Sequence, residues 1–438
     1  MVILIKVLQL IMALSLLVLI HEFGHYIFAR LFKIRVEQFY LFFPPAIFKY
    51  KPKKSDTEFG IGCIPLGGFC KISGMIDESM DKEALAQEPQ PWEFRTRPAW
   101  QRLFVMIGGV LFNFIFAIFL YCAILFVWGK EYLRNDDAVY GIQVNELSER
   151  MGFRDGDRIL AFDGAPVEDF FKLQAELVRS QAATASVLRA GDTLELAIDP
   201  ELLPEAMNTP GLFSLAVPMA VGSVPDTSIN AGVGLQAGDR FLQVGTQPVF
   251  YYKELQAALE QYKNTTVDVL FLRGADTVAV PLQVNDLGKI QVGLGGDVRA
   301  VQWTRKEYSF LEAIPAGFQL TFSTIGDYLK ELKLIFTPKT EAYKSLGSFI
   351  AIGSIFPSTW NWQSFWNITA WLSIMLAVLN LLPIPALDGG HVLFVLYEMI
   401  TRRKPSDKFL EYAQMVGMVL LLTLVVFALS NDFIRYVF

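Results

Sequence analysis

Four long stretches of the chain consist almost entirely of apolar residues. They cover about residues 2–32, 103–128, 365–382 and 409–429, and apolar sequence resumes at Val392–Leu396. Each stretch is about as long as, or longer than, the roughly 20 residues that a helix needs to cross the hydrocarbon core of a bilayer. The pattern therefore predicts a polytopic α-helical membrane protein with four spans.

The spans divide the chain into predicted segments. The transmembrane helices are expected at 1–33, 100–128, 365–400 and 401–438. Between them we expect a β-loop region at 34–99, two small domains at 129–216 and 217–303, and an amphipathic helical segment at 304–364.

A cleaved signal peptide is the alternative for the first apolar stretch. Such a peptide has an early basic region and a cleavage site of small residues. Here only Lys6 is basic, and the stretch continues through His21–His25 without a cleavage signal. We interpret it as a retained helix.

Basic residues next to the spans predict the orientation. The segment after the first span is rich in lysine and arginine between Arg30 and Lys54, and the loop before the fourth span contains Arg402–Lys404. Loops with such an excess face the cytoplasm. Both termini and the region from about 129 to 364 are then expected on the outer side.

Strand-like sequence with turn residues marks the cytoplasmic segment. Examples are Val36–Tyr40 and Phe59–Phe69, and the second includes the pair Gly67 and Gly68. Paired glycines allow a tight turn or a close backbone approach. Because an open sheet edge cannot face lipid, we expect this β-loop to border a cavity enclosed by protein.

The outer region contains an internal repeat. Gly152–Leu160 resembles Gly234–Leu242, and the same spacing relates Pro166–Val167 to Pro248–Val249 and Leu173–Ala175 to Leu255–Ala257. A gapless match over a loop, a turn and a helix predicts two copies of one small α+β domain.

Composition excludes some classes of function. The net charge of −6 argues against a nucleic-acid partner, and three cysteines in 438 residues give no disulfide framework.

Residues Glu307–Ile335 are predicted to form an amphipathic helix, either packed on the protein or lying on the membrane.

His21-Glu22-Phe23-Gly24-His25 is an HExxH motif on a predicted helix. The spacing places both imidazoles on one face, where they can bind one metal ion, and Glu22 can activate a metal-bound water. The chain has only three histidines, so chance pairing is a poor explanation. Ionisable residues inside a span are costly and indicate function.

Catalytic zinc usually takes three protein ligands. Asp388 is the natural third ligand, because it follows an apolar span and lies in Asn380–His391, where prolines and glycines break the helix. A capping role for Asp388 is the alternative. His391 is the other candidate ligand, but a structural role or a place behind the ligands is favoured.

These residues predict Zn²⁺-dependent peptide hydrolysis with Glu22 as the general base. The substrate must be extended, so strand addition to an edge near Gly67 and Gly68 would present it. Asn380 is a candidate for holding the substrate backbone.

The sequence closely resembles the site-2 protease family of intramembrane zinc metalloproteases, in particular its bacterial regulator-of-sigma-E branch. HExxH and Asn380-x-x-Pro383-x-Pro385-x-Leu387-Asp388-Gly389 carry the resemblance. Pro65–Phe69 resembles the family's membrane-reentrant β-loop, and Gly109-x-x-x-Asn113 its GxxxN motif, which adds Asn113 to the substrate-binding candidates. The repeat resembles tandem PDZ domains. Ser345–Gly353 resembles a stretch after them, with Ser348 in place of the usual proline.

The resemblance implies an inner-membrane enzyme with periplasmic PDZ domains. It implies single-pass membrane substrates already trimmed on the outer side, such as anti-sigma factors or remnant signal peptides. The PDZ pair would act as a size filter or read new peptide C-termini.

The sequence disfavours three other classes of function. An inactive scaffold with a structural metal would not need Glu22, and a secreted zincin would not place HExxH within a span. A metal transporter would need more intramembrane carboxylates than Asp388.

Overall fold

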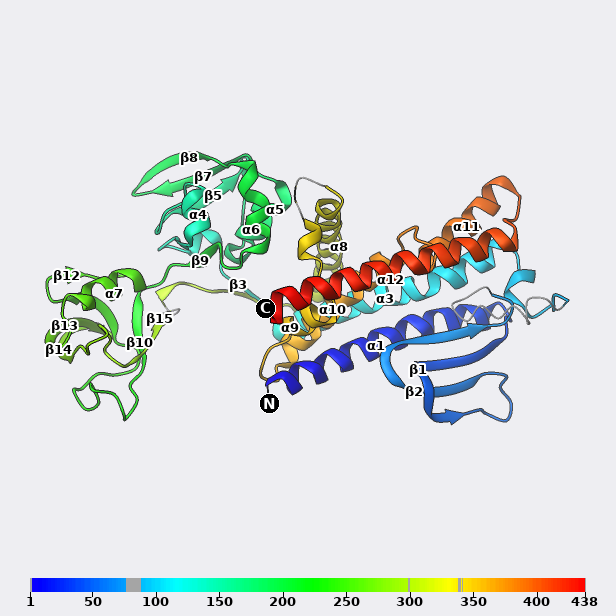
Figure 1. The fold of residues 1–438 in the computed structure, drawn as a ribbon, viewed down its shortest axis with the longest axis horizontal. Coiled ribbons are helices and arrows are strands. Elements are labelled where there is room, and N and C mark those ends of the chain that lie inside the picture. Colours follow the sequence, from blue (N-terminus) through cyan, green and yellow to red (C-terminus); the bar gives the residue numbers. More distant parts are fainter. Residues whose placement is uncertain (1, 76–87, 298–299, 338–339, 341, 438) are drawn as a thin grey trace. The chain divides into compact units, whose positions relative to one another are not determined.

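The computed structural model describes residues 2–75, 88–297, 300–337, 340 and 342–437. Residues 76–87 of the predicted β-loop region lie outside the described residues. The chain forms two compact units (Figure 1): one consists of the residues up to Lys130 and from Glu307 onward, and the other is Glu131–Lys306.

The first unit is mainly helical. Its helices are α1 (Val2–Leu31), α3 (Ala99–Trp128), α8 (Phe310–Ile335), α9 (Phe349–Ile355), α10 (Trp362–Asn380), α11 (Asp388–Thr401) and α12 (Asp407–Val437). Among the described residues, three helical stretches are long and apolar enough to cross a membrane, namely Val2–Leu31, Ala99–Trp128 and Lys408–Ile434. They correspond to the first, second and fourth predicted spans.

The third predicted span is divided into two helices. α10 ends at Asn380, α11 begins at Asp388, and residues 381–387 form a turn that contains two prolines. Proline cannot donate the helical backbone hydrogen bond, so the helix stops there. In this turn Ala386 has a φ of +84°, in the left-handed region that a residue with a side chain seldom adopts. The turn fixes where Asp388 begins the next helix.

α1 and α3 approach each other closely. A Cβ atom added to Gly24 would lie only 2.2 Å from the carbonyl oxygen of Gly108, which is far inside van der Waals contact. Glycine at both positions therefore lets the two backbones touch. This contact places the α1 histidines against the middle of α3.

The predicted β-loop is an antiparallel sheet of β1 (Val36–Tyr50) and β2 (Glu58–Ile72). Both strands bend, so that Phe39 of β1 pairs with Phe59 on one side and with Cys70 on the other. The sheet thus has four segments, in the order 46–50, 58–62, 38–41 and 68–72. Within the described residues, the last segment pairs with β1 on one side only and forms an edge.

α8 packs against α3 at a small-residue contact. A Cβ on Gly317 would meet the sulfur of Cys122 at 2.4 Å. This contact fits the first of the two interpretations of the amphipathic segment, a helix packed on the protein.

The second unit contains the repeat as two similar arrangements. The first comprises β4 (Ile142–Val144), α4 (Glu146–Arg150), β5 (Arg158–Phe162), β6 (Ala165–Pro166), α5 (Leu173–Ser180), β7 (Thr184–Arg189), β8 (Asp192–Ala197), α6 (Leu203–Asn208) and β9 (Phe213–Leu215). The second comprises β10 (Met219–Ser223), β11 (Arg240–Val244), β12 (Gln247–Pro248), α7 (Tyr252–Glu260), β13 (Thr266–Arg273), β14 (Asp276–Gln283) and β15 (Gly293–Gly296). Short strands β3 (Lys130–Tyr132) and β16 (Thr304–Lys306) lie at the two ends of this stretch of chain. Strand order β6-β5-β7-β8 recurs as β12-β11-β13-β14.

The repeated aspartate makes the same contacts in both copies. Asp157 binds Arg189 and Asp239 binds Arg273, each through two hydrogen bonds of 2.6–2.8 Å, and both aspartates are buried. Burial raises the pKa of Asp239, but hydrogen bonds from Arg273 and from a backbone N–H outweigh this and hold it below its usual value. The matched motif therefore marks an ion pair within the fold of each copy.

Candidate metal centre and substrate cavity

The two histidines of HExxH project from the same face of α1. They are four residues apart, slightly more than one helical turn, and their rings meet edge to face with centroids 4.9 Å apart. Both side chains are buried. The sequence spacing thus produces two imidazoles that face one point.

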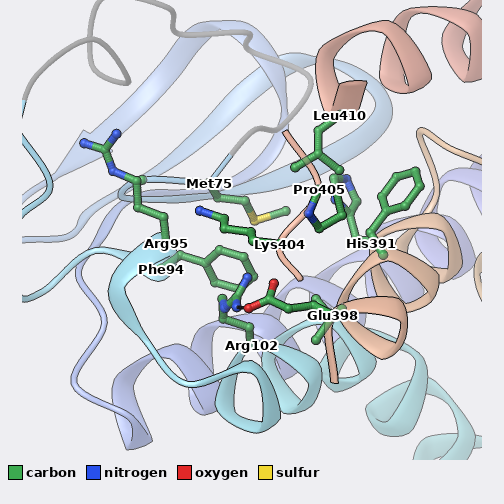
Figure 2. A pocket seen from close by; sticks show the side chains of 12 residues that line it. Met75, Phe94, Arg95, Arg102, His391, Glu398, Lys404, Pro405 and Leu410 are labelled. Carbon is green, nitrogen blue, oxygen red and sulfur yellow. Dashed lines mark hydrogen bonds and ion pairs between the residues drawn. The ribbon is translucent and has the colours of Figure 1, made fainter. Parts of the chain in front are cut away.

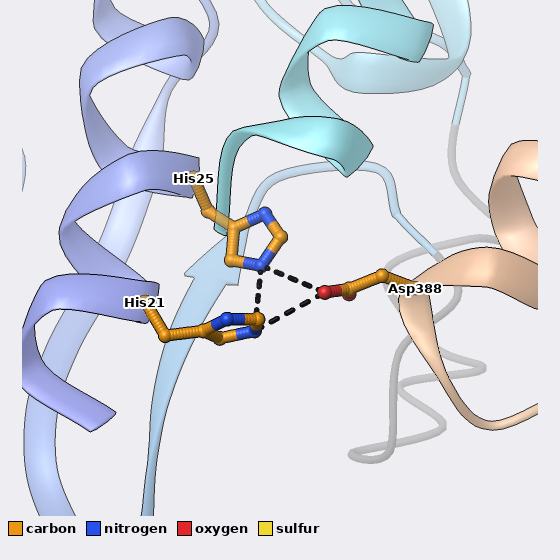
Figure 3. A group of neighbouring side chains, drawn as sticks. All are labelled: His21, His25 and Asp388. Carbon is orange, nitrogen blue, oxygen red and sulfur yellow. Dashed lines mark hydrogen bonds and ion pairs between the residues drawn. The ribbon is translucent and has the colours of Figure 1, made fainter. Parts of the chain in front are cut away.

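Asp388, the first residue of α11, reaches the same point (Figure 3). Its Oδ2 atom lies 3.1 Å from His21 Nε2 and 3.4 Å from His25 Nε2, and the two Nε2 atoms are 3.3 Å apart. Within the described part of the chain, this is the group of metal-ligating side chains close enough to hold one ion. Helices far apart in the sequence supply its members.

The triangle has the dimensions of a zinc site. Ligand atoms about 2.0–2.1 Å from a tetrahedral zinc lie about 3.3–3.4 Å from one another. The three observed separations, 3.1–3.4 Å, agree with this. Asp388 Oδ2 is also buried without a hydrogen-bond partner in the described structure, as expected of an atom that binds a cation. The donor set of two imidazoles and one carboxylate fits Zn²⁺.

The backbone of α3 fixes the tautomer of His25. His25 Nδ1 lies 2.8 Å from the carbonyl oxygen of Val105, which can only accept. The proton must therefore be on Nδ1, and Nε2 keeps its lone pair for a metal. Hydrogen bonds of this kind orient metal-binding histidines in general.

His21 is flanked by two asparagines. Asn113 Nδ2 lies 3.3 Å from His21 Nδ1, and Asn380 Nδ2 lies 3.4 Å from His21 Nε2. Asn113, expected at the substrate, is instead fully buried behind the histidine and is not among the cavity-lining residues. Asn380 does line the cavity, beside the metal-binding atoms.

A glycine of α3 makes room for the imidazoles. A Cβ on Gly109 would lie 2.5 Å from His25 Nε2 and 2.6 Å from His21 Cε1. From the sequence, Gly109 was singled out only as part of the GxxxN motif. Glycines inside apolar spans were the available signal for such close contacts.

A cavity of about 640 Å³ opens beside the three ligand atoms. Its lining includes Glu22, Asn380, Gly67 and Gly68 together with the metal-ligand candidates. Gly68 lies close to α1, because an added Cβ would be 2.7 Å from Val18 and 3.6 Å from Glu22 Cγ. The structure therefore brings the predicted sheet edge and the predicted base to one space.

The Glu22 side chain contacts the β2 edge directly. Its carboxylate accepts a hydrogen bond from the backbone N–H of Cys70. Since Cys70 lies in the edge segment of the sheet, this bond ties the carboxylate to the strand that borders the cavity. Cys70 was not singled out from the sequence.

His391 lies outside the triangle of ligand atoms. It lines both the large cavity and a second, smaller one, which Figure 2 shows together with Arg102 and Glu398. In that smaller cavity Arg102 of α3 donates a 2.5 Å hydrogen bond to Glu398 of α11. The ion pair joins the helix that carries Asp388 to the helix that packs on HExxH.

Comparisons with known proteins show a family match and several relatives. Residues 9–424 match Peptidase family M50. The chain is 29% identical to the "Regulator of sigma E protease" of Haemophilus influenzae, over 97% of this chain and 98% of that protein. It is 28% identical to the "Regulator of sigma-E protease RseP" of Salmonella typhimurium and 27% identical to the "Putative zinc metalloprotease" of Vibrio cholerae, over 97% of both chains in each case.

Proposed function

The chain belongs to peptidase family M50 and is a zinc metalloprotease of the membrane, and from this premise we propose that it hydrolyses peptide bonds in the transmembrane segments of single-pass membrane proteins. The observation that supports this most is the set of His21, His25 and Asp388 beside Glu22, in a cavity between apolar helices and an open sheet edge.

His21, His25 and Asp388 would hold the zinc ion. When bound, zinc lowers the pKa of a water ligand to about 7 and polarises the scissile carbonyl group. Asn113 orients His21: its buried Oδ1 atom has no hydrogen-bond partner in the described structure. Turning the amide by 180° would let Oδ1 accept the Nδ1 proton of His21, which leaves Nε2 free for the metal.

Glu22 is the general base. It follows His21 in the chain and lines the cavity, and its carboxylate is held by the N–H of Cys70. It takes the proton of the attacking water and delivers it to the nitrogen of the leaving amide. The strand edge thus sets the position of the base relative to a substrate on the same edge.

The substrate binds as an extended strand. Helical amides are already hydrogen-bonded, so the transmembrane segment must unwind before its carbonyl group can react. The edge segment of β2, which includes Gly68, offers backbone groups for strand addition. Asn380, on the other wall of the cavity, holds substrate backbone groups near the ligand atoms.

The chain crosses the membrane four times, with the broken pair α10 and α11 as the third crossing. The basic loops support a cytoplasmic position for the β-sheet, and the repeats, as PDZ domains, lie on the periplasmic side. There they filter substrates by size or read new C-termini. Two of the relatives are named as regulators of sigma E, which supports a trimmed anti-sigma factor as a substrate. Remnant signal peptides are a second substrate of the same chemistry.

The test uses a single-pass reporter, with and without its outer part, in membranes that contain the wild type or Glu22→Gln. Glu260→Gln, at an exposed carboxylate of α7, is the control. We expect the wild type and the control to cut the trimmed reporter within its span, and Glu22→Gln to leave it intact at equal protein level. Equal cleavage by Glu22→Gln would contradict the role of Glu22. Cleavage of the untrimmed reporter alone would contradict the substrate class.

A further inference from the structure

An unusual side chain for its surroundings is Gln414 on α12. This helix is apolar, and most of the side chains in its membrane-type stretch are exposed. Gln414 is instead only 3% exposed and lines the large cavity. A buried amide on an otherwise apolar helix needs hydrogen-bond partners.

The amide of Gln414 contacts the turn that precedes Asp388. Its Oε1 atom accepts a 3.2 Å hydrogen bond from the backbone N–H of Ala386. Ala386 has the left-handed φ of +84°, and conformations of this kind persist only where neighbouring groups hold them. The hydrogen bond from Ala386 to Gln414 is one such restraint, two residues before Asp388.

A glycine one turn further along α12 contacts the same turn. A Cβ on Gly417 would lie 1.7 Å from the carbonyl oxygen of Pro385. Gln414 and Gly417 are three residues apart and thus lie on one helix face. Independent contacts therefore seat α12 on the Pro385–Ala386 turn.

We propose that Gln414 is a positioning residue for zinc binding: through Ala386 it holds the turn that places Asp388 opposite His21 and His25. This rests on the proposed function, in which Asp388 is a zinc ligand. Zinc ligands commonly depend on such supporting contacts, and losing one typically weakens metal affinity by about 10–100-fold. A direct contact with substrate is the competing role, because Gln414 also lines the cavity.

The first measurement is zinc affinity of the purified full-length protein, by competition with a chelator of known affinity. Gln414→Met keeps the length of the side chain and removes the amide, so we expect zinc to bind about 10–100-fold more weakly. Thr423→Val is the control, because it removes a polar group from an exposed site on the same helix, where the Thr423 hydroxyl donates to the Val419 carbonyl. It should bind zinc as the wild type does.

The second measurement repeats Gln414→Met in an Asp388→Ala background. If Gln414 acts through Asp388, the two changes are not additive, and Gln414→Met should change zinc affinity by less than about twofold there. An equal loss in both backgrounds would overturn the proposal, as would wild-type zinc affinity together with a raised KM for the reporter. Gly417→Ala, which disturbs the contact between α12 and the Pro385–Ala386 turn at a second position, should also weaken zinc binding.

His21→Ala separates this proposal from the function on which it rests. If His21→Ala kept wild-type zinc affinity, the assignment of the zinc ligands would be wrong. If His21→Ala lost zinc and both Gln414→Met and Gly417→Ala kept it, only the role of Gln414 would fail.

Discussion

Replacing Gly109 by alanine should disable the metal centre while leaving the helix intact. The new Cβ would lie 2.5 Å from His25 Nε2 and 2.6 Å from His21 Cε1, where unstrained contacts need about 3.5 Å. The backbones of α1 and α3 already touch at Gly24 and Gly108, so the helices cannot separate without losing that contact. The imidazoles must therefore shift by about 1 Å.

A displacement of about 1 Å at a catalytic site can cost about 100-fold in rate, equivalent to about 2.7 kcal/mol of transition-state stabilisation. Alanine itself favours a helix over glycine by about 1 kcal/mol, so α3 should not unfold. We expect Gly109→Ala to lower kcat/KM for the trimmed reporter about 100-fold and to release zinc more readily, at normal protein level.

The matched control is Gly326→Ala in α8, where an added Cβ meets no atom within 4 Å. It makes the same chemical change in a helix and should keep wild-type cleavage. If Gly109→Ala stayed within about twofold of the wild type in both cleavage and zinc retention, Gly109 would not confine the imidazoles.

Three further predictions concern other parts of the molecule. Gly68→Ala should raise the KM for the trimmed reporter more than it lowers kcat, because its Cβ pushes the β2 edge away from α1; an unchanged KM would contradict binding at this edge. Arg102→Ala should lower the thermal unfolding midpoint in detergent, because it leaves the mostly buried Glu398 unpaired. Breaking a buried pair in this way costs about 3–5 kcal/mol of stability, and replacing both residues by methionine should restore most of the lost stability. The pKa of Asp239 is held below its unfolded value of about 3.9, so the ion pair stabilises the fold above that pH, and this stabilisation is lost as the pH falls through the folded pKa. Asp239→Asn should therefore speed hydrogen exchange in β11 and β13 at pH 7. The difference from the wild type should shrink towards pH 3.

The chemistry was more predictable from sequence than the packing that supports it. HExxH fixes two imidazoles by helical periodicity alone, and the position of Asp388 after an apolar span, where prolines and glycines break the helix, made it the natural third ligand. No local pattern states how far apart residues 25 and 388 lie, so their meeting at 3.4 Å required the structure.

The residues that support the metal ligands were harder to predict from the sequence. Val105 acts through its backbone carbonyl, which any residue type could provide, and so its side chain carries no signal. Asn113 was assigned to the substrate by resemblance, whereas it is buried against His21. Gln414 lies in a stretch whose apolar pattern predicted a span and nothing more.

The fold shows the same division. Apolar runs gave helices close to their expected positions, because such runs are long and uniform. Gly67 and Gly68 indicated a close approach, but the doubled-back sheet in which Phe39 pairs on two sides depends on bends that the alternation of side chains does not encode. The repeat was visible because each copy needs its own buried aspartate, Asp157 or Asp239.

We propose that His21, His25 and Asp388 bind one zinc ion, with His391 outside the site. Zinc K-edge X-ray absorption of purified Asp388→Cys and His391→Cys tests it most directly, because a zinc–sulfur distance of about 2.3 Å is distinct from nitrogen or oxygen at about 2.0–2.1 Å. We predict one sulfur ligand in Asp388→Cys and none in His391→Cys. A sulfur ligand in His391→Cys, with the wild-type spectrum in Asp388→Cys, would contradict the account.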